Sequence, residues 1–319
     1  MNQQQFEFMK NMSKDYESLG EQIGILLNEK QACYGDAFGK MEEVFKILYP
    51  SGIATHQYKD VLTLARILDK VFRITNLPED RKDTMGEEPY KDIGIKTLKP
   101  FKIKNQIASA MKQIASINEQ ILSKKLFPFI LGGEHSITSG SIRPFVKKFK
   151  DLYILHFDAH ADLREQYGGE KFSHATAIRR CLDFKNVKVI SFGIRNLSKE
   201  EMDFYNKNKK KIKIFWGSKK NKWKISEIRK IFKNKNVYIT FDVDGLDSSV
   251  MPATGTPEPG GMFWSDVIPI IKNVCSVSNV VGADINELAP IKNFNSCNFL
   301  VAKLAYKIIS YVFEFKSKY

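Results

Sequence analysis

The stretch that most constrains the fold is an apolar pentapeptide, VYITF (residues 237–241), followed at once by Asp242 and Asp244. Aromatic and β-branched residues without alternation predict a strand that is buried on both faces, as in a parallel sheet. Ionised carboxylates are costly next to a core unless they are paired or bind a metal ion. In open parallel sheets, ligands bind beyond the carboxyl ends of the strands. The stretch therefore predicts a metal site at the end of a buried strand.

From residue 93 onwards, predicted helices alternate with apolar strands. The expected strands cover residues 127–131, 152–157, 187–192, 212–216, 237–241 and 277–283. The expected helices cover residues 104–124, 139–148, 173–183, 226–233, 265–274 and 299–313. Such alternation predicts an α/β fold in which a parallel sheet is covered by helices on both faces, giving three layers.

Residues 1–92 show a different pattern. Between Tyr58 and Thr75, apolar residues recur at intervals of three and four, which predicts an amphipathic helix, and no strand signal interrupts the segment. We therefore expect two domains, an all-helical domain at 1–92 and an α/β domain at 93–319. The first resembles a small helical domain associated with nucleotide modification, on the motifs YGD (34–36), ILYP (47–50), RILDK (66–70) and EPYKD (88–92).

The charge balance bears on the class of partner. The 319-residue chain carries a formal net charge of +14, and such a basic balance raises the question of a polyanionic partner. The excess is mostly lysine, densest between Lys199 and Lys235, without paired arginines or a recurring aromatic platform for stacked bases. This pattern favours a solvated surface over a nucleic-acid site. We expect no nucleic-acid partner for the α/β domain.

Cysteine spacing and hydropathy indicate the compartment. The four cysteines lie far apart and form no CxxC pair, which is typical of reduced thiols. The first twenty residues lack the apolar core of a signal peptide, and no apolar run approaches the ~18 residues of a membrane span. We therefore expect a cytoplasmic protein without a membrane partner.

Three predicted strands end in metal-ligand residues. GGEH (132–135), DAHAD (158–162) and DVD (242–244) each follow an apolar strand. If the strands are parallel, these ends share one edge of the sheet, and alternate residues of an extended segment point the same way. Imidazole and carboxylate ligands without thiolate favour Mn²⁺ over Ni²⁺, Co²⁺, Fe²⁺ or Zn²⁺. The residues expected to converge on a binuclear site are His135, Asp158, His160, Asp162, Asp242 and Asp244.

The other histidines and a glycine-rich loop complete the pattern. Among the five histidines, His174 is expected near the site and His156 is expected to be structural. Two metals bridged by carboxylates lower the pKa of water enough to make a nucleophile at neutral pH. The loop TGTPEPGG (254–261) follows the aspartates and is suited to shaping a small polar substrate.

These residues together resemble the ureohydrolase family, which includes arginase and agmatinase. The resemblance covers residues 93–319, and TGTPEPGG with the run that ends in SHA is most like the agmatinases. It is carried by the motifs GGEHSIT (132–138), HFDAHADLR (156–164), SHAT (173–176), FDVDGLD (241–247), MPATGTPEPGG (251–261) and DINELAP (284–290).

The resemblance implies a role for each matching residue. Two Mn²⁺ per subunit are implied, with Asp158 and Asp242 bridging them. His135 and Asp162 would complete the ligands of one metal, and His160 and Asp244 those of the other. Further implied roles are orientation of the hydroxide by Asp162, proton transfer by His174, binding of the guanidinium by Glu287 and a substrate contact by Thr256.

The implied activity is hydrolysis of a small guanidino compound to urea and an amine, with agmatine giving putrescine. Arginase activity, or action on another guanidino acid, is an alternative, because residues 163–171 do not decide the substrate. The family's usual N-terminal strand and glycine-rich loop are not found in residues 1–92. A metal-binding pseudoenzyme or a nucleotide-associated regulatory protein is therefore a further alternative. The resemblance also implies a homo-oligomer, either a trimer or a hexamer.

Overall fold

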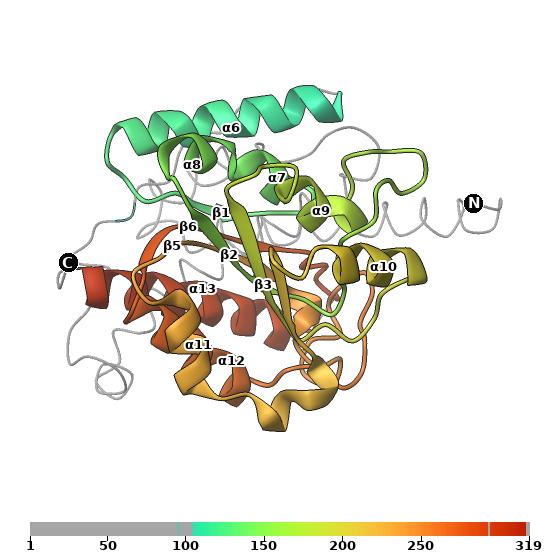
Figure 1. Ribbon diagram of the computed structural model, residues 1–319. Coiled ribbons are helices and arrows are strands. Elements are labelled where there is room, and N and C mark those ends of the chain that lie inside the picture. The colour runs from blue at the N-terminus through green and yellow to red at the C-terminus, as the bar shows by residue number, and fades with distance from the viewer. Residues whose placement is uncertain (1–94, 96–103, 105, 293, 317–319) are drawn as a thin grey trace, which may run out of the picture.

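The computed structural model describes residues 106–292 and 294–316, together with Ile95 and Lys104. Strands and helices alternate through this part of the chain (Figure 1). The strands are β1 (Phe129–Leu131), β2 (Leu152–Phe157), β3 (Val187–Phe192), β4 (Ile212–Phe215), β5 (Asn236–Asp242) and β6 (Asn279–Asn286). The helices are α6 (Ile107–Ser123), α7 (Ile137–Ser141), α8 (Arg143–Lys148), α9 (Ala177–Cys181), α10 (Lys199–Lys207), α11 (Ile225–Phe232), α12 (Trp264–Cys275) and α13 (Ser296–Lys316). The 3-10 turns are η2 (His174–Thr176), η3 (Gly217–Lys222) and η4 (Val243–Gly245).

The described strands form one sheet in the order β1-β6-β5-β2-β3-β4, and all its pairings are parallel. After β2 the chain moves outward through β3 and β4, and it then returns to β5 and continues through β6 on the other side of β2. Strand order therefore reverses between β2 and β5. A reversal of this kind opens a crevice at the carboxyl ends of the two strands, where open α/β sheets bind their ligands.

Two cores flank the sheet because successive residues of each strand face opposite sides. On β2, Leu152 and Ile154 pack in a cluster with α8 and α9, whereas Leu155 and Phe157 pack in a cluster with α11, α12 and α13. Figure 1 shows the matching layers, with α6, α7 and α8 above the sheet and α11, α12 and α13 below it. The predicted three-layer α/β fold is confirmed for residues 106–292 and 294–316, and the helical domain expected at 1–92 lies outside the described residues.

Three local differences from the predicted elements have physical causes. The helix expected at 139–148 is divided into α7 and α8, and Pro144, which has no N–H to donate, stands in the first turn of α8. Helix α10 was not predicted, although Ser198 and Glu201 form a capping box at its start. Strand β6 runs on to Asn286, beyond the predicted end at 283, because its last polar residues are buried and bonded.

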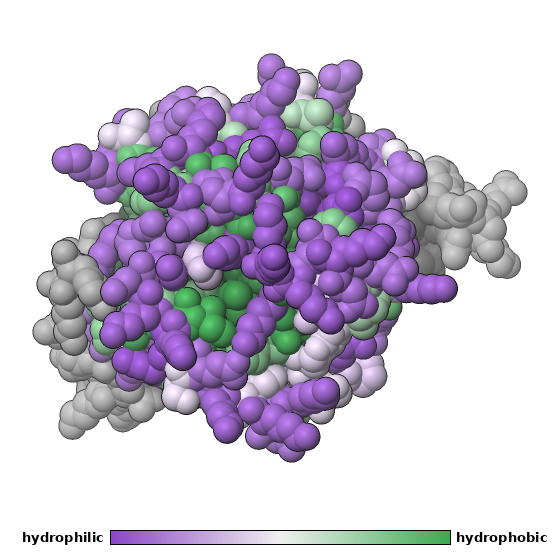
Figure 2. All heavy atoms as spheres, viewed as in Figure 1, coloured by the Kyte–Doolittle hydropathy of each residue, from purple (hydrophilic) through white to green (hydrophobic). Residues whose placement is uncertain are grey.

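The surface and the cysteines fit the sequence pattern. Hydrophilic side chains cover most of the face seen in Figure 2, and Lys209, Lys210, Lys222 and Lys224 are exposed. Cys181, Cys275 and Cys297 are buried free thiols, while position 33 is outside the described residues. None of the described helices is both long and apolar enough to cross a membrane.

Candidate active site

Strand register places two of the predicted ligands side by side. Asp158 directly follows β2 and Asp242 ends β5, the two strands that flank the topological reversal. The preceding residues, Phe157 and Phe241, are paired in the sheet, and their rings stack with centroids 4.9 Å apart. The paired phenylalanines thus place the next residues, Asp158 and Asp242, side by side at the carboxyl ends of the two strands. Both aspartates are nearly or fully buried, with exposed fractions of 0% for Asp158 and 4% for Asp242.

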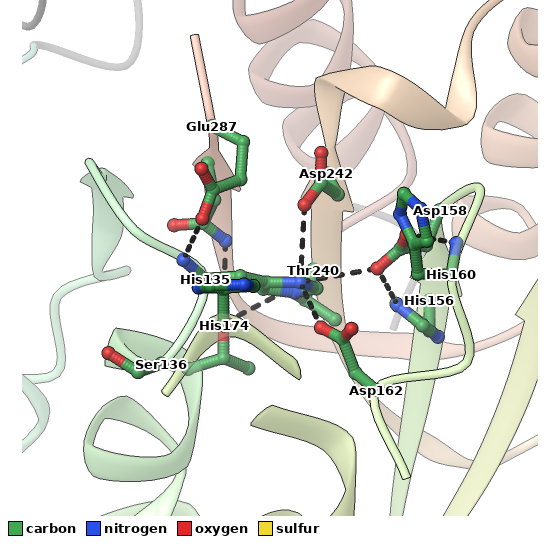
Figure 3. A network of polar contacts seen from close by, with 12 residues as sticks. His135, Ser136, His156, Asp158, His160, Asp162, His174, Thr240, Asp242 and Glu287 are labelled. Carbon is green, nitrogen blue, oxygen red and sulfur yellow. Dashed lines mark hydrogen bonds and ion pairs between the residues drawn. The ribbon is translucent and has the colours of Figure 1, made fainter. Parts of the chain in front are cut away.

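His135 lies at the centre of the predicted cluster (Figure 3). Its fully buried Nδ1 is 2.9 Å from Asp162 Oδ2, 3.2 Å from Asp158 Oδ2 and 3.4 Å from Asp242 Oδ2. Within the described part of the chain, this nitrogen nevertheless forms no hydrogen bond of acceptable geometry. A buried ring nitrogen that faces three carboxylates without a proper hydrogen bond is the arrangement expected where all four groups share a metal ion.

A second cluster adjoins the first through Asp158. His160 Nδ1 lies 2.9 Å from Asp244 Oδ2 and 3.6 Å from Asp158 Oδ1. The backbone N–H of Asp244 donates to Asp242 Oδ1 at 2.9 Å, and Thr256 Oγ1 donates to Asp244 Oδ2 at 3.2 Å. Among the described residues, two sets of ligand atoms lie within 4.8 Å of one another, His135/His156/Asp158 and Asp158/His160/Asp244. Asp158 is common to both sets.

The pKa values of two of the clustered aspartates, Asp162 and Asp242, are raised. Burial and the charge of Asp158 raise the pKa of Asp162 to about 6. Burial and the charge of Asp244 raise the pKa of Asp242 well above its usual value. Burial opposes protonation of His135, but the neighbouring carboxylates of Asp158 and Asp162 outweigh this effect and raise the imidazole pKa. Crowded acids of this kind are satisfied either by protons or by metal cations.

The donor set fits divalent metal ions. It combines imidazole nitrogens with carboxylate oxygens, the ligand chemistry of Mn²⁺ and related cations, and none of the described cysteines belongs to it. His156, a member of one of the two sets above, already has a partner at each ring nitrogen: its Nε2 contacts Asp158 Oδ2 at 2.8 Å and its Nδ1 contacts Ser191 Oγ at 3.0 Å. His156 therefore orients the carboxylate of Asp158 from the core side.

Glu287 and Asp162 share an uncommon backbone conformation. Their φ angles are +65° and +52°, in the left-handed region that non-glycine residues seldom adopt. The Glu287 N–H donates to Gly133 O at 2.7 Å, and its Oε1 accepts from the His135 N–H at 2.6 Å. Burial and the charge of Glu134 raise the pKa of Glu287 to about 8. Two residues singled out from the sequence thus occupy strained positions at the same site.

Glu134 is a site residue that the sequence analysis did not single out. Its Oε1 accepts from the His174 N–H at 2.8 Å and lies 3.2 Å from His174 Nδ1. Ser136 Oγ donates to its other oxygen at 2.7 Å. By accepting a hydrogen bond from the ring of His174, Glu134 raises the pKa of this imidazole, which is half-exposed. In the sequence, the signal for Glu134 was its position next to His135 in the GGEH motif.

The comparisons with known proteins agree with this geometry. The arginase family model matches residues 66–310. The chain belongs to the arginase family. The N(1)-aminopropylagmatine ureohydrolase of Synechocystis is 30% identical over 262 residues, covering 78% of this chain and 83% of that protein. The agmatinase of Bacillus anthracis is 36% identical over 214 residues, covering 64% of this chain and 71% of that protein.

A solved structure extends the likeness. The agmatine ureohydrolase of Thermoplasma volcanium has a TM-score of 0.70 and 25% identity, covering 92% of this chain and 99% of that one. The resemblance to ureohydrolases, and to agmatinases in particular, is confirmed, and the chain is an enzyme of this arginase-family type. The family match begins at residue 66, inside the segment assigned to a separate helical domain, so the boundary at residue 92 stays a prediction.

Arg195 is a second residue that the sequence analysis did not single out. It follows β3, and its guanidinium donates to the carbonyls of Asp244 at 2.8 Å, Glu258 at 2.7 Å and Pro259 at 3.0 Å. Longer bonds reach the carbonyls of Gly193, Gly245 and Leu246. A single side chain therefore joins the segment that carries Asp244 to the glycine-rich loop that carries Thr256. Its short motif, GIR after a strand, gave no chemical signal in the sequence.

Proposed function

We propose that this arginase-family enzyme hydrolyses agmatine to putrescine and urea. The observation that carries the proposal is the convergence of four buried aspartates and two histidines beside Glu287, whose carboxylate is suited to a planar cation. The relatives named agmatinase and agmatine ureohydrolase support this choice of substrate.

We further propose that two Mn²⁺ ions bind at this site. Asp158 lies near both His135 and His160, and Asp242 lies 3.4 Å from His135 and accepts from the N–H of Asp244, so both suit a bridging role. His135 and Asp162 would hold one ion, and His160 and Asp244 the other. Two such cations would supply the positive charge that lowers the pKa of a shared water, making a nucleophile available near neutral pH. The same charge would keep the carboxylates ionised, which burial alone opposes.

The protein's own groups then position the substrate. Glu287, held by its backbone bond to Gly133 and by the His135 N–H, would accept a bidentate hydrogen bond from the guanidinium. This role requires the ionised carboxylate, which the charge of the bound guanidinium stabilises. Thr256, fixed on Asp244, would border the pocket. Asp162 would orient the attacking water through its buried carboxylate.

Proton transfer completes the reaction. Water adds its oxygen to the guanidinium carbon, the bond from that carbon to the alkyl nitrogen breaks, and the amine leaves with a proton. Glu134 binds the Nδ1 side of His174, so Nε2 is the ring nitrogen that can carry this proton. Because Glu134 raises the pKa of His174, the imidazole retains a proton at a higher pH than a free histidine.

Agmatine is favoured over the alternatives for a specific reason. Both curated relatives described above are named for agmatine or its aminopropyl derivative, so the shared chemistry is a guanidine on an alkyl amine. Arginine would require additional groups for an α-carboxylate and an α-amine. Aminopropylagmatine is the second candidate substrate, and the names of the relatives alone do not separate it from agmatine.

Urea release from a panel of guanidines tests the proposal. The purified protein is incubated with Mn²⁺ and with agmatine, aminopropylagmatine, arginine or 4-guanidinobutyrate, and urea is measured colorimetrically. We expect agmatine to give the highest kcat/KM and Asp158→Asn to abolish release. Two bound Mn²⁺ without urea from any of these compounds would identify a metal-binding pseudoenzyme and overturn the proposal.

The assembly and the compartment are also proposals. By resemblance to the family, we propose a homo-oligomer, trimeric or hexameric, that acts in the cytoplasm. Light scattering coupled to gel filtration measures the mass directly, and a mass near the 36.6 kDa of one chain would contradict the oligomer. Nucleotide binding by the full chain, lost on substitution within 1–92, would instead support the regulatory alternative.

A further inference from the structure

A chain of buried hydroxyls runs from His135 into the core of the sheet. His135 Nε2 lies 2.9 Å from Thr240 Oγ1, and Thr240 Oγ1 lies 3.1 Å from Thr138 Oγ1. Thr138 Oγ1 in turn donates to Asp284 Oδ2 at 3.1 Å. All four residues are fully buried. The row of hydroxyls begins at Nε2 of His135, whereas Nδ1 is the ring nitrogen that faces the candidate metal ligands (Figure 3).

Asp284 ends the chain as a group surrounded by donors. Besides Thr138, Tyr238 OH donates to its Oδ2 at 2.7 Å and Asn286 Nδ2 donates to its Oδ1 at 2.7 Å. An ionised carboxylate only accepts hydrogen bonds, whereas a hydroxyl both donates one and accepts others. These three donors favour the ionised form of Asp284, whereas burial opposes it and raises the pKa of this carboxyl above its usual value.

Because Asp284 only accepts, every hydrogen bond between His135 and Asp284 has the same donor-to-acceptor direction. Because Thr138 uses its proton on Asp284, it is free to accept the proton of Thr240. Thr240, having donated to Thr138, accepts from His135 Nε2. The ring must then carry its proton on Nε2, which leaves the lone pair of the neutral imidazole on Nδ1. That nitrogen is the one that faces Asp158, Asp162 and Asp242.

We propose that Asp284, acting through Thr138 and Thr240, is a positioning residue that fixes the tautomer and the ring orientation of His135 for metal binding. The three elements involved are the start of α7, the end of β5 and the end of β6, so the chain ties the site to the centre of the sheet. The proposal rests on the proposed function only in requiring that the site binds Mn²⁺. Outer hydrogen-bond partners of metal-binding histidines commonly have this effect, and their loss costs about 10- to 100-fold in metal affinity or activity.

Mn²⁺ affinity of the full-length protein, measured by titration calorimetry without substrate, tests the proposal. Thr240→Val removes the hydroxyl next to His135 while keeping a side chain of similar shape. We expect it to weaken one of the two Mn²⁺ equivalents about 10- to 100-fold. Thr240→Ser keeps the hydroxyl and loses only a methyl group, and it should stay within about threefold of the wild type. Rescue by serine separates the hydrogen bond from packing.

Two further variants test the far end of the chain. Asp284→Leu removes both acceptor oxygens and with them the direction of the hydrogen bonds, so it should weaken Mn²⁺ binding as Thr240→Val does. Tyr238→Phe removes a hydrogen bond from the same carboxylate without interrupting the path to His135, and it should leave the affinity unchanged. Thermal melts of each metal-free protein confirm folding, and Ser310→Ala serves as a control for loss of a buried hydroxyl elsewhere.

The outcomes distinguish the two levels of the proposal. Absence of Mn²⁺ binding by the wild type would overturn both the metal site and the positioning role. Wild-type affinity in folded Thr240→Val and Asp284→Leu would overturn the positioning role alone. An equal loss in Thr240→Val, Thr240→Ser and Tyr238→Phe would also overturn it, because such a loss would follow packing and not the direction of the hydrogen bonds.

Discussion

Gly245 follows Asp244 in the chain and packs against the backbone of Asp158. Adding one methyl group at this position should therefore damage the site more than the fold. A Cβ at Gly245 would lie 2.8 Å from the backbone N of Asp158 and 3.0 Å from its Cα. Ordinary van der Waals contact begins at 3.4 Å, so the end of β2 and the turn after β5 must separate by about 0.6 Å. Both contacts are with backbone, which cannot rotate away as a flexible side chain can.

The expected cost follows from this displacement. Overpacking of a dense interior costs about 1–3 kcal/mol, which corresponds to a fall in Tm of roughly 2–12 °C for a domain of this size. Displacement of a catalytic group by 1 Å costs on the order of 100-fold in rate. We therefore expect Gly245→Ala to remain folded and to lose about 10- to 100-fold in Mn²⁺-dependent kcat/KM for urea release.

Gly282→Ala is the matched control. A Cβ there would lie 2.6 Å from Phe145 Cζ and 2.9 Å from Tyr238 Cε2, so the crowding is similar but falls on core side chains. We expect a comparable loss of Tm with kcat/KM within about threefold of the wild type. Melting curves and initial rates are measured on the same preparations. If both variants lose activity equally, or if Gly245→Ala keeps full activity, the reasoning from the Asp158 backbone is refuted.

Three further predictions concern metal, proton transfer and acid stability. Mn²⁺ at a concentration of about 100 times its Kd should add about 2.7 kcal/mol to the free energy of unfolding of the EDTA-treated protein. The gain should appear as a rise in Tm that Asp158→Asn abolishes. An equal rise in the variant would place the metal elsewhere. Glu134→Gln should lower kcat about tenfold with little change in KM. It should also move the alkaline limb of the pH profile of kcat to lower pH, because the hydrogen bond to Glu134 raises the pKa of His174. An alkaline limb at the wild-type position would contradict this. Asp247→Asn should lower Tm at neutral pH, because the Ser249 hydroxyl lowers the pKa of Asp247 to about 2. That stabilisation is present above the unfolded pKa of about 3.9 and is lost as the pH falls through the pKa of the folded state. The difference in Tm between the two proteins should therefore narrow from pH 5 to pH 3, and a constant difference would refute the prediction.

Sequence patterns predict much of the fold because hydrophobic period and strand ends are local properties. The strands at 152–157 and 187–192 have the predicted bounds, since each is a short apolar run limited by polar residues. The ligand side chains could be grouped because parallel strands present their carboxyl ends at one edge. The domain boundary at residue 92 and the roles of individual site residues stay predictions.

The parts that could not be predicted depend on contacts between distant segments. Glu134 has its role through His174, forty positions along the chain, and Asp284 acts on His135 only through threonines from two other elements. Neither relation leaves a periodic trace in the sequence. Helix α10 differs, because its capping box is a local signal that the sequence does contain. The helix was not predicted because the lysine-rich sequence around it was interpreted as a solvated surface.

The guanidinium of Arg195 limits how this enzyme can change during evolution. It binds the carbonyl of Asp244, before the glycine-rich loop, and those of Glu258 and Pro259 within the loop, so the length of chain between them is matched to one rigid planar group. An inserted or deleted residue would leave part-buried N–H groups without acceptors, and the cost for a fully buried group, about 1–3 kcal/mol, is an upper limit for each. New substrate preferences should therefore arise by exchange of side chains on a loop of constant length, or from segments outside it.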